Sequence, residues 1–405
     1  MDGTVERAYK ISHPWLTFDR IDLTRAGAEF WMLLGESRSK VQHLSMALLR
    51  PDVRDAMLQV FLAKGAHATT AIEGNTLSEE QVVEIVAGRA DPPASQEYLY
   101  KEVENILAAY NRIKDALVSG GDPRLTVDEI KQFNSEVLDG IEENGVTPGE
   151  IRTGSVVVGP RYRGAPAEDC EYLLERLCDW LDSSDFEPPT DDFVVPFALI
   201  KAVIAHLYVA WIHPFDNGNG RTARLIELQI LMAAGVPMPA AHLLSNHYNI
   251  TRDEYYRRLQ EASDTGGEVV PLLRYAVQGF VDGIRGQVDY VWEQQYSDRW
   301  RQFIYEAFDG RPTSHAELRR FQLVTRLSER WEPVARRDIP GLDPFLAVAY
   351  MGTERMLSRD LNVLEELDLI EQAGHGHWQA ARGQILAFRP LRREAEIRSA
   401  VASAG

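Results

Sequence analysis

Cysteine, net positive charge and long uninterrupted hydrophobic runs are all scarce in this 405-residue chain. Its two cysteines, Cys170 and Cys178, lie eight residues apart, so they share one helix face without being close enough to bridge. We expect free thiols in a reducing cytosol. The formal net charge of -18 opposes nucleic acid and anionic membranes over the molecule as a whole, so protein partners are favoured and any nucleic-acid contact needs a local basic patch.

The hydropathy and charge pattern of the sequence also predicts neither a secretory leader nor a membrane span. The first residues, MDGTVERAYK, lack a basic segment followed by an apolar core. The most apolar stretch, residues 197–215, contains Lys201 and His206, which predicts a buried helix rather than a membrane span. We interpret His206 as a core histidine with satisfied hydrogen bonds. A cytoplasmic protein without membrane contact is therefore expected.

Apolar residues recur at helical spacing over most of the chain, which predicts a mainly α fold. The main strand signal before the C-terminal third is TGSVVVGPRYRG, residues 153–164, where a β-branched run meets a Gly-Pro turn. This run predicts a short β-hairpin.

From about Arg311 the arginines roughly balance the acids, which indicates a separate C-terminal domain. A first helix, a turn at residues 340–344 and an amphipathic helix at residues 358–369 come first. LIEQAGHGHWQA, residues 369–380, and then QILAFRP, residues 384–390, predict two short strands around a Gly-His turn. The order of these elements, helix, helix and hairpin, resembles a winged helix-turn-helix. The alternative is a small helical domain for protein contacts or dimerisation.

A glycine-rich run, HPFDNGNGRTAR at residues 213–224, separates two helical patterns. Gly218, Asn219 and Gly220 can take the positive φ values that let backbone N–H groups converge, and the next helix points its positive end at the same spot. The run therefore predicts an anion-binding nest.

Three side chains of this run fit phosphate chemistry. Arg221 and Arg224 lie three apart in the first turn of the second helix, and two guanidinium forks suit a polyphosphate. His213, at the other lip of the loop, can take a proton from a hydroxyl near neutral pH. A base facing a phosphate cradle predicts phosphoryl or nucleotidyl transfer.

The same run resembles the signature of the Fic family: a histidine, a phenylalanine, an acidic residue, Gly-Asn-Gly-Arg and a final arginine. The resemblance spans roughly residues 56–262 and implies a helical core with a small β-hairpin. It also implies transfer of AMP from ATP to a Ser, Thr or Tyr hydroxyl of a target protein. Adenylylation is favoured over the phosphotransfer of the related Doc toxins because Gly220 stands where the Doc pattern resembles a lysine substitution.

By this resemblance, His213 is the general base and Phe215 packs the loop into the core. Gly218, Asn219 and Gly220 bind the α-phosphate region, while Arg221 and Arg224 hold the β- and γ-phosphates. Asn246 and Tyr256 are candidates for adenine or ribose contacts. The competing interpretation of these last two is a helical core position.

One position departs from the family pattern. The family has its acidic residue immediately before the first loop glycine, where it holds Mg²⁺; here Asn217 occupies that position and the carboxylate is one residue earlier, at Asp216. An Asn oxygen can ligate Mg²⁺ but brings no charge. Either Asn217 is the metal ligand, or Asp216 takes over through a water, or Asp216 is a solvated loop carboxylate.

A second pattern is HATTAIEGNTLSEE at residues 67–80, which taken alone predicts only the end of one helix and the start of the next. Thr69 and Glu73 are four apart on one predicted helix face, which Gly74 or the next residue ends. Ser78 with Gln81 resembles a capping box that opens the next helix.

With the first motif present, TTAIEG is similar to the N-terminal inhibitory pattern of class II Fic proteins. The resemblance implies that Glu73 forms a bidentate pair with Arg224 and removes the fork that holds the γ-phosphate. ATP would then bind unproductively, and Thr69 would belong to the same inhibitory segment.

TPGEIRTG, before the predicted hairpin, is similar to the run that leads into the family's flap. In that interpretation Val156, Val157, Val158 and Gly159 add a strand to the target segment through main-chain hydrogen bonds. The alternative is a plain surface hairpin.

We expect four regions: residues 1–118 with the inhibitory motif, a Fic core at 119–265, connecting helices at 266–310, and a winged-helix-like domain at 311–393. Two rival functions remain. One is an enzyme of the same scaffold that removes AMP, with Glu73 positioning water, or uses another nucleotide. The other is a DNA-binding regulator with a nucleotide-sensing Fic core. A homodimer, and DNA contact through the C-terminal domain, are further hypotheses beside the target protein.

Overall fold

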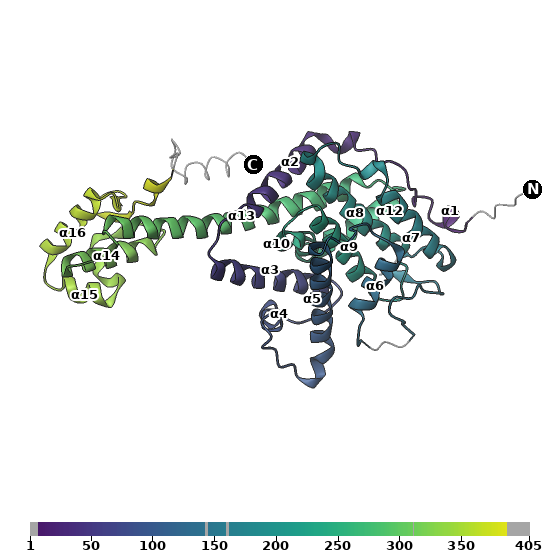
Figure 1. Cartoon of the computed structure of the whole chain (residues 1–405), viewed down its shortest axis with the longest axis horizontal. Helices are drawn as coiled ribbons and strands as arrows, with labels where there is room; N and C mark the ends of the chain where they lie inside the picture. The colour runs from purple at the N-terminus through teal and green to yellow at the C-terminus, as the bar shows by residue number, and fades with distance from the viewer. Residues whose placement is uncertain (1–6, 142–144, 159–161, 311, 387–405) are drawn as a thin grey trace, which may run out of the picture. The chain divides into compact units, whose positions relative to one another are not determined.

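The computed structural model describes residues 7–141, 145–158, 162–310 and 312–386. Most of these residues are helical, which confirms the predicted mainly α class (Figure 1). The chain divides into two compact units, Met1–Val291 and Trp292–Gly405. The predicted four-part division is finer than this and stays a prediction.

The first unit contains a set of α-helices connected by short 3-10 turns. Its α-helices are α1 (Tyr9–Ser12), α2 (Gly27–Ser45), α3 (Pro51–Ala71), α4 (Glu79–Val86), α5 (Glu97–Val118), α6 (Val127–Val137), α7 (Cys170–Leu181), α8 (Val194–Ile212), α9 (Asn219–Ala233), α10 (Met238–Ala241), α11 (Leu243–Ile250), α12 (Arg252–Asp264) and the start of α13 (Val270–Ala307). The 3-10 turns are η1 (Thr24–Ala26), η2 (Ala94–Gln96), η3 (Ala167–Asp169), η4 (Ser184–Phe186) and η5 (Asp191–Phe193).

Helix α8 runs through the core of this unit. It is apolar on every side, and nearly all its side chains are buried, as expected for a helix enclosed by others. Residues 191–212 are also long and apolar enough to cross a membrane, but 72 % of their most apolar window is buried inside the unit. His206, on α8, is buried in the core as expected, and its Nε2 bonds the hydroxyl of Tyr255 at 2.8 Å; its Nδ1 lies 3.1 Å from Glu227 but makes no hydrogen bond in the described chain, so only one of its two nitrogens is satisfied.

The predicted hairpin is present and very short. Strand β1 (Val157–Val158) pairs antiparallel with β2 (Tyr162–Arg163). The hydroxyl of Tyr162 donates to the carbonyl of Trp211, and His13 contacts the carbonyl of Arg163. These contacts tie β2 to the body of the unit and leave β1 as the outer strand of the described hairpin.

The second unit contains α14 (His315–Ser328), β3 (Val334–Ala335), η6 (Arg336–Leu342), α15 (Pro344–Tyr350), α16 (Glu354–Glu366), β4 (Ile370–Gln372), β5 (His377–Ala380) and η7 (Arg382–Ile385). The strands form one antiparallel sheet in the order β3-β5-β4. Its core includes a buried carboxylate, Asp360, which accepts from Arg319, Arg320 and Tyr350. The winged-helix name for this arrangement stays a prediction.

Several details of the second unit differ from the sequence expectation. Strand β3 and helix α15 were not predicted, because each has at most seven residues and short elements carry little periodicity. Both hairpin strands lie within residues 369–380. Of the second predicted strand, residues 384–390, only 384–386 are described, and residues 382–385 form a 3-10 turn; the rest of that prediction lies outside the described residues. Helix α16 begins at Glu354, four residues before the predicted start.

Candidate active site

The loop between α8 and α9 turns on two residues with left-handed backbone. His213 ends α8 with φ 51°, and Gly218 precedes α9 with φ 79°. A side chain at Gly218 would also meet Nδ2 of Asn134 at 2.9 Å, so glycine is required there for two reasons. Asn219 and Gly220 do not take positive φ as expected, because they already belong to α9.

Internal hydrogen bonds hold this loop rigid. The side chain of Asn219 accepts from the backbone N–H of Phe215 at 2.9 Å and donates to its carbonyl at 2.7 Å. Phe215 is 1 % exposed, so it packs the loop into the core as predicted. Asn134, on α6, donates to the carbonyl of Asn217 at 2.9 Å. The loop therefore presents the N-terminus of α9, where the first N–H groups have no intrahelical acceptor, as a preformed anion site.

A carboxylate from another part of the chain lies at this helix terminus. Oε1 of Glu73 is 2.5 Å from Nη2 of Arg224. The same oxygen is only 2.2 Å from the point where a Cβ on Gly220 would stand, so the carboxylate is packed against the helix backbone itself. Glu73 thus occupies the position at which the loop would receive an anion.

The contact between Glu73 and Arg224 is not the bidentate pair that we expected. Nη2 of Arg224 is shared between Glu73 and the carbonyl of Thr69, at 2.9 Å from the latter, while Nε and Nη1 are buried without a hydrogen-bond partner in the described chain. Burial alone would raise the pKa of Glu73, but the charge and hydrogen bond of Arg224, together with the positive charge of Arg221, outweigh burial and hold the pKa below its usual value. The carboxylate is therefore ionised at neutral pH.

Glu73 reaches Arg224 from a turn and not from a helix face. Helix α3 ends at Ala71, and Glu73 lies in the turn that follows, where Gly74 has φ 102°. Thr69 contributes its carbonyl to Arg224, while its hydroxyl is 3.2 Å from that of Tyr110. The predicted capping box of Ser78 and Gln81 is present at the start of α4.

The imidazole of His213 is a neutral base in this environment. Burial lowers the pKa of His213 to about 4, the positive charge of Arg152 acts in the same direction, and the charge of Glu73 opposes them. Arg152 also donates to the carbonyl of His213 at 2.7 Å and to that of Gly154 at 2.5 Å. Arg152 therefore joins the base of the hairpin to the turn that presents His213.

The predicted flap lies next to His213. A side chain at Gly164 would meet Cβ of His213 at 3.0 Å, so the base of the hairpin packs directly against the catalytic candidate. Val157 is 58 % exposed, and Val156 and Val158 are partly buried. Gly159 lies outside the described residues.

The two candidate contacts for adenine or ribose lie on neighbouring helices. Oδ1 of Asn246, on α11, is buried without a partner in the described part of the chain. The ring of Tyr256, on α12, is 45 % exposed, and its hydroxyl is 3.4 Å from the carbonyl of Ile72. Tyr256 therefore lies beside the turn that carries Glu73, and a nucleotide contact by either residue stays a prediction.

The residues expected to hold Mg²⁺ do not fit a divalent cation in this arrangement. Oδ1 of Asn217 accepts from its neighbour Gly218 at 2.5 Å and from Nη2 of Arg221 at 3.3 Å, so a cation on this oxygen would face a guanidinium. Asp216 is an exposed carboxylate. No group of three or more His, Cys, Asp or Glu side chains suited to a metal occurs among the described residues.

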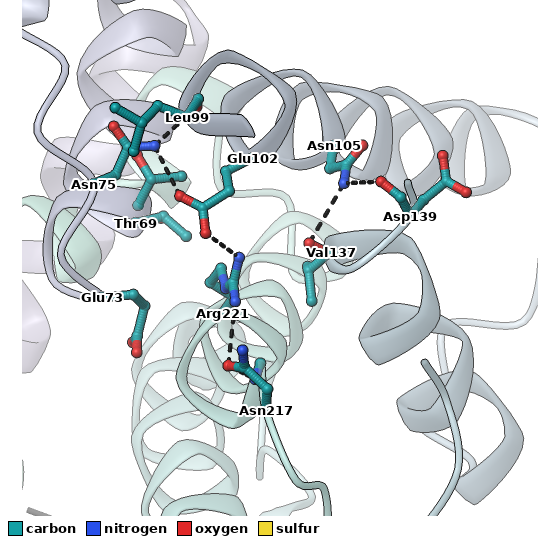
Figure 2. A network of polar contacts seen from close by, with 12 residues as sticks. Thr69, Glu73, Asn75, Leu99, Glu102, Asn105, Val137, Asp139, Asn217 and Arg221 are labelled. Atoms are coloured by element: carbon teal, nitrogen blue, oxygen red, sulfur yellow. Dashed lines mark hydrogen bonds and ion pairs between the residues drawn. The ribbon is translucent and has the colours of Figure 1, made fainter. Parts of the chain in front are cut away.

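Two further residues of the site, Glu102 and Asn75, were missed as functional candidates. Glu102, on α5, contacts Arg221, and Asn75 contacts Glu102 (Figure 2). Glu102 lies 119 residues from Arg221 in the sequence, and a glutamate in an amphipathic helix carries no local signal of such a contact. Asn75 was considered only as a helix stop.

Part of the chain is similar in sequence to known proteins. Residues 124–231 match the model of the Fic/DOC family. Protein adenylyltransferase fic-1 of Caenorhabditis elegans is 34 % identical over 216 residues, which is 52 % of this chain and 38 % of the relative. Protein adenylyltransferase Fic of Aedes aegypti is 28 % identical over 259 residues, 64 % of this chain and 45 % of the relative. The chain thus spans less than half the length of these relatives.

Solved structures give the same result for the fold. A fragment of Fic-1 from Caenorhabditis elegans has a TM-score of 0.54 at 25 % identity, with 66 % of this chain and 74 % of that chain covered. A Fic family protein from Desulfovibrio desulfuricans has a TM-score of 0.53 at 20 % identity, with 89 % and 97 % covered. Residues 124–231 are a Fic/DOC-family domain.

Proposed function

We propose that this protein transfers AMP from ATP to a Ser, Thr or Tyr hydroxyl of a target protein, and that Glu73 keeps its resting state inactive. One observation carries the proposal. A carboxylate sits on the N-terminus of α9 and on Arg224, where an anion of the substrate would be bound. The names of the relatives, protein adenylyltransferases, support the reaction class.

The proposed reaction uses groups of this chain. Neutral His213 takes the proton from the target hydroxyl, whose oxygen attacks the α-phosphorus of ATP. The new P–O bond forms as the bond to the β-phosphate oxygen breaks, and pyrophosphate leaves with its electron pair. The N–H groups of α9, with Arg221 and Arg224, stabilise the charge that develops on the phosphates.

Release from inhibition requires an exchange of anions at Arg224. Arg224 has a side chain 1 % exposed, so it needs a negative partner at all times. Glu73, whose side chain is 32 % exposed in a turn, is the partner that can leave when the terminal phosphates of ATP arrive. The Mg²⁺ expected from the sequence is given no step in this reaction, because the donors at Asn217 do not fit it.

The target segment is proposed to pair with β1. Its partner β2 is tied to the body of the unit, so β1 is the strand with an outer edge. An extended peptide on that edge would be held mainly by main-chain hydrogen bonds. Its hydroxyl would then be delivered next to His213, against which the hairpin base packs. A cytoplasmic location, a homodimer and DNA contact stay predictions.

The test is intact-mass spectrometry of the full chain incubated with ATP and Mg²⁺. Four proteins are compared: wild type, Glu73→Gly, the double variant Glu73→Gly with His213→Ala, and Glu187→Gly as a control with the same substitution at an exposed loop position. We expect an AMP adduct on Glu73→Gly alone. Because self-modification stands in for a target, a lysate incubated with labelled ATP is assayed in parallel.

The product also separates the rival reactions. Free AMP without an adduct in either assay would indicate hydrolysis, and an adduct of another mass would indicate transfer of another group. An adduct on the double variant as strong as on Glu73→Gly would remove His213 from the proposed role. Equal adducts on wild type and Glu73→Gly would remove the inhibition by Glu73.

A further inference from the structure

The first arginine of α9 has its own carboxylate, separate from the inhibitory one. Nη1 of Arg221 donates to Oε1 of Glu102 at 2.8 Å, and Nη2 reaches Oδ1 of Asn217 at 3.3 Å. Figure 2 shows this line of contacts running from α5 to the loop, with Glu73 to one side of it. Arg221 is therefore fixed between a helix and the loop by hydrogen bonds that do not involve Glu73.

Glu102 is itself held in place. Its second oxygen, Oε2, accepts from Nδ2 of Asn75 at 2.8 Å, and the same nitrogen donates to the carbonyl of Leu99 at 2.8 Å. Oδ1 of Asn75 accepts from the backbone N–H of Leu77 at 3.0 Å. Asn75 is 8 % exposed and therefore forms a buried bracket between the turn and α5.

Asn75 lies only two residues beyond Glu73, so the same short turn reaches Arg224 directly and Arg221 through Glu102. The contact to Arg224 is direct and comes from a partly exposed side chain. The contact to Arg221 passes through Glu102, a side chain on a long helix that is 17 % exposed and bonded at both oxygens. The first contact can open as a movement of one side chain, whereas moving Glu102 away from Arg221 would also break the hydrogen bond between Glu102 and Asn75.

We infer that Glu102, held by Asn75, is a positioning residue for Arg221. It keeps the guanidinium aimed at the loop whether or not Glu73 has left Arg224, so the terminal phosphates of a nucleoside triphosphate meet one fork that is already oriented. The inference rests on the proposed function, because it concerns the same phosphate site. Its ligand class is the β- and γ-phosphate groups and not the nucleoside or the α-phosphate.

Calorimetric binding of ATP and of AMP to the full chain tests this role. The comparison uses Glu73→Gly, Glu73→Gly with Glu102→Gln, and Glu73→Gly with Glu104→Gln. Glu104 is an exposed glutamate on the same helix, so the last protein controls for the substitution. We expect Glu102→Gln to weaken the binding of ATP roughly tenfold, which is the size of one charge-assisted hydrogen bond. Binding of AMP should not change, and Glu104→Gln should bind both nucleotides as Glu73→Gly does.

A purely structural role would give a different result. If Glu102 only supported the fold, Glu102→Gln would weaken the binding of ATP and of AMP equally. That outcome, or unchanged binding of ATP, would overturn the inference. If Glu102→Gln fails to fold, Asn75→Ser removes the amide that holds Glu102, and Asn105→Ser on α5 is its control, because Asn105 bonds only the carbonyls of Val137 and Asp139 in the described chain (Figure 2). We expect Asn75→Ser to weaken the binding of ATP selectively, as Glu102→Gln does. Equally weakened ATP binding in both serine variants would overturn the positioning role.

Failure of the proposed function has another signature. If Glu73→Gly binds neither ATP nor AMP, the proposed nucleotide site is contradicted. The positioning role of Glu102 depends on that site and is then contradicted as well. If Glu73→Gly binds ATP more tightly than AMP but Glu102→Gln leaves that preference intact, only the positioning role is wrong.

Discussion

The two arginines at the start of α9 are both almost fully buried, at 4 % and 1 % side-chain exposure, yet they are held in opposite ways. Arg221 is paired with a carboxylate on a long helix, which a buried amide fixes. Arg224 is paired with a carboxylate on a turn, which little else holds in the described chain. We propose that these two positions, one helical turn apart, serve as a scaffold and as a switch, because the carboxylate of Glu102 is held by a further hydrogen bond and that of Glu73 lies on a turn.

The largest effect is expected from removing either arginine in the released protein. In the Glu73→Gly background, Arg221→Gln and Arg224→Gln should each lower the rate of adduct formation about 100-fold, as loss of one donor to developing charge does. The measurement is the initial rate of labelling with ATP. If Arg221→Gln retains full activity, the two arginines do not share the phosphates, and the comparison fails.

A smaller effect on stability distinguishes the scaffold from the switch. Glu73→Gln and Glu102→Gln should each lower the free energy of unfolding by about 1–2 kcal/mol, because each leaves a buried guanidinium without its ion pair. ATP should restore the melting temperature of Glu73→Gln only, since Glu73 still covers the site in the other variant. Thermal melts with and without ATP test this. Restoration of both variants would contradict a covered resting site.

A carboxylate introduced at position 217, whose side chain contacts Arg221, tests how the loop binds metal. Asn217→Asp would add a carboxylate beside the loop, so the Mg²⁺ concentration that gives half-maximal labelling in the Glu73→Gly background should fall by about tenfold. A Mg²⁺ titration measures it, with Asp216→Asn as the counterpart. An unchanged requirement in Asn217→Asp, together with a raised one in Asp216→Asn, would assign the metal to Asp216.

The smallest expected change concerns pH. In the proposed reaction the neutral imidazole of His213 is the active form, and it is lost as pH falls through its pKa, which burial lowers to about 4. Removing Glu73 takes away a charge that raises this pKa, so kcat/KM of Glu73→Gly should change less than about twofold between pH 7 and 5.5. A pH profile of labelling tests it. A decline centred near 6.5, the ordinary histidine value, would contradict the buried base.

Local chemistry explains which parts of the site could be predicted. The loop, the two helices around it and the arginines follow from one run of residues, because turn glycines and helix starts are encoded within a few positions. The capping box of Ser78 and Gln81 was predictable for the same reason. The contact between Glu73 and Arg224 came only from the family resemblance, since the two residues are 151 apart.

Other features depend on tertiary packing and left no local pattern. Arg152 gathers carbonyls from both sides of the site, and an arginine in a loop gives no sign of this in the sequence. The expected bidentate pair was wrong because Arg224 shares one nitrogen with the carbonyl of Thr69. The side chain of Asn219 braces Phe215 within the loop, which the sequence did not indicate, while phosphate binding by the backbone at Asn219 stays a prediction.

The most direct test of the central claim is calorimetric binding of inorganic triphosphate, which contains the anion without adenosine. If the carboxylate of Glu73 and the terminal phosphates compete for Arg224, wild type should show no measurable binding, Glu73→Gly should bind, and Arg224→Gln added to Glu73→Gly should abolish that binding. Equal binding of triphosphate by wild type and Glu73→Gly would contradict the account, because the anion site would then be open while Glu73 is in place.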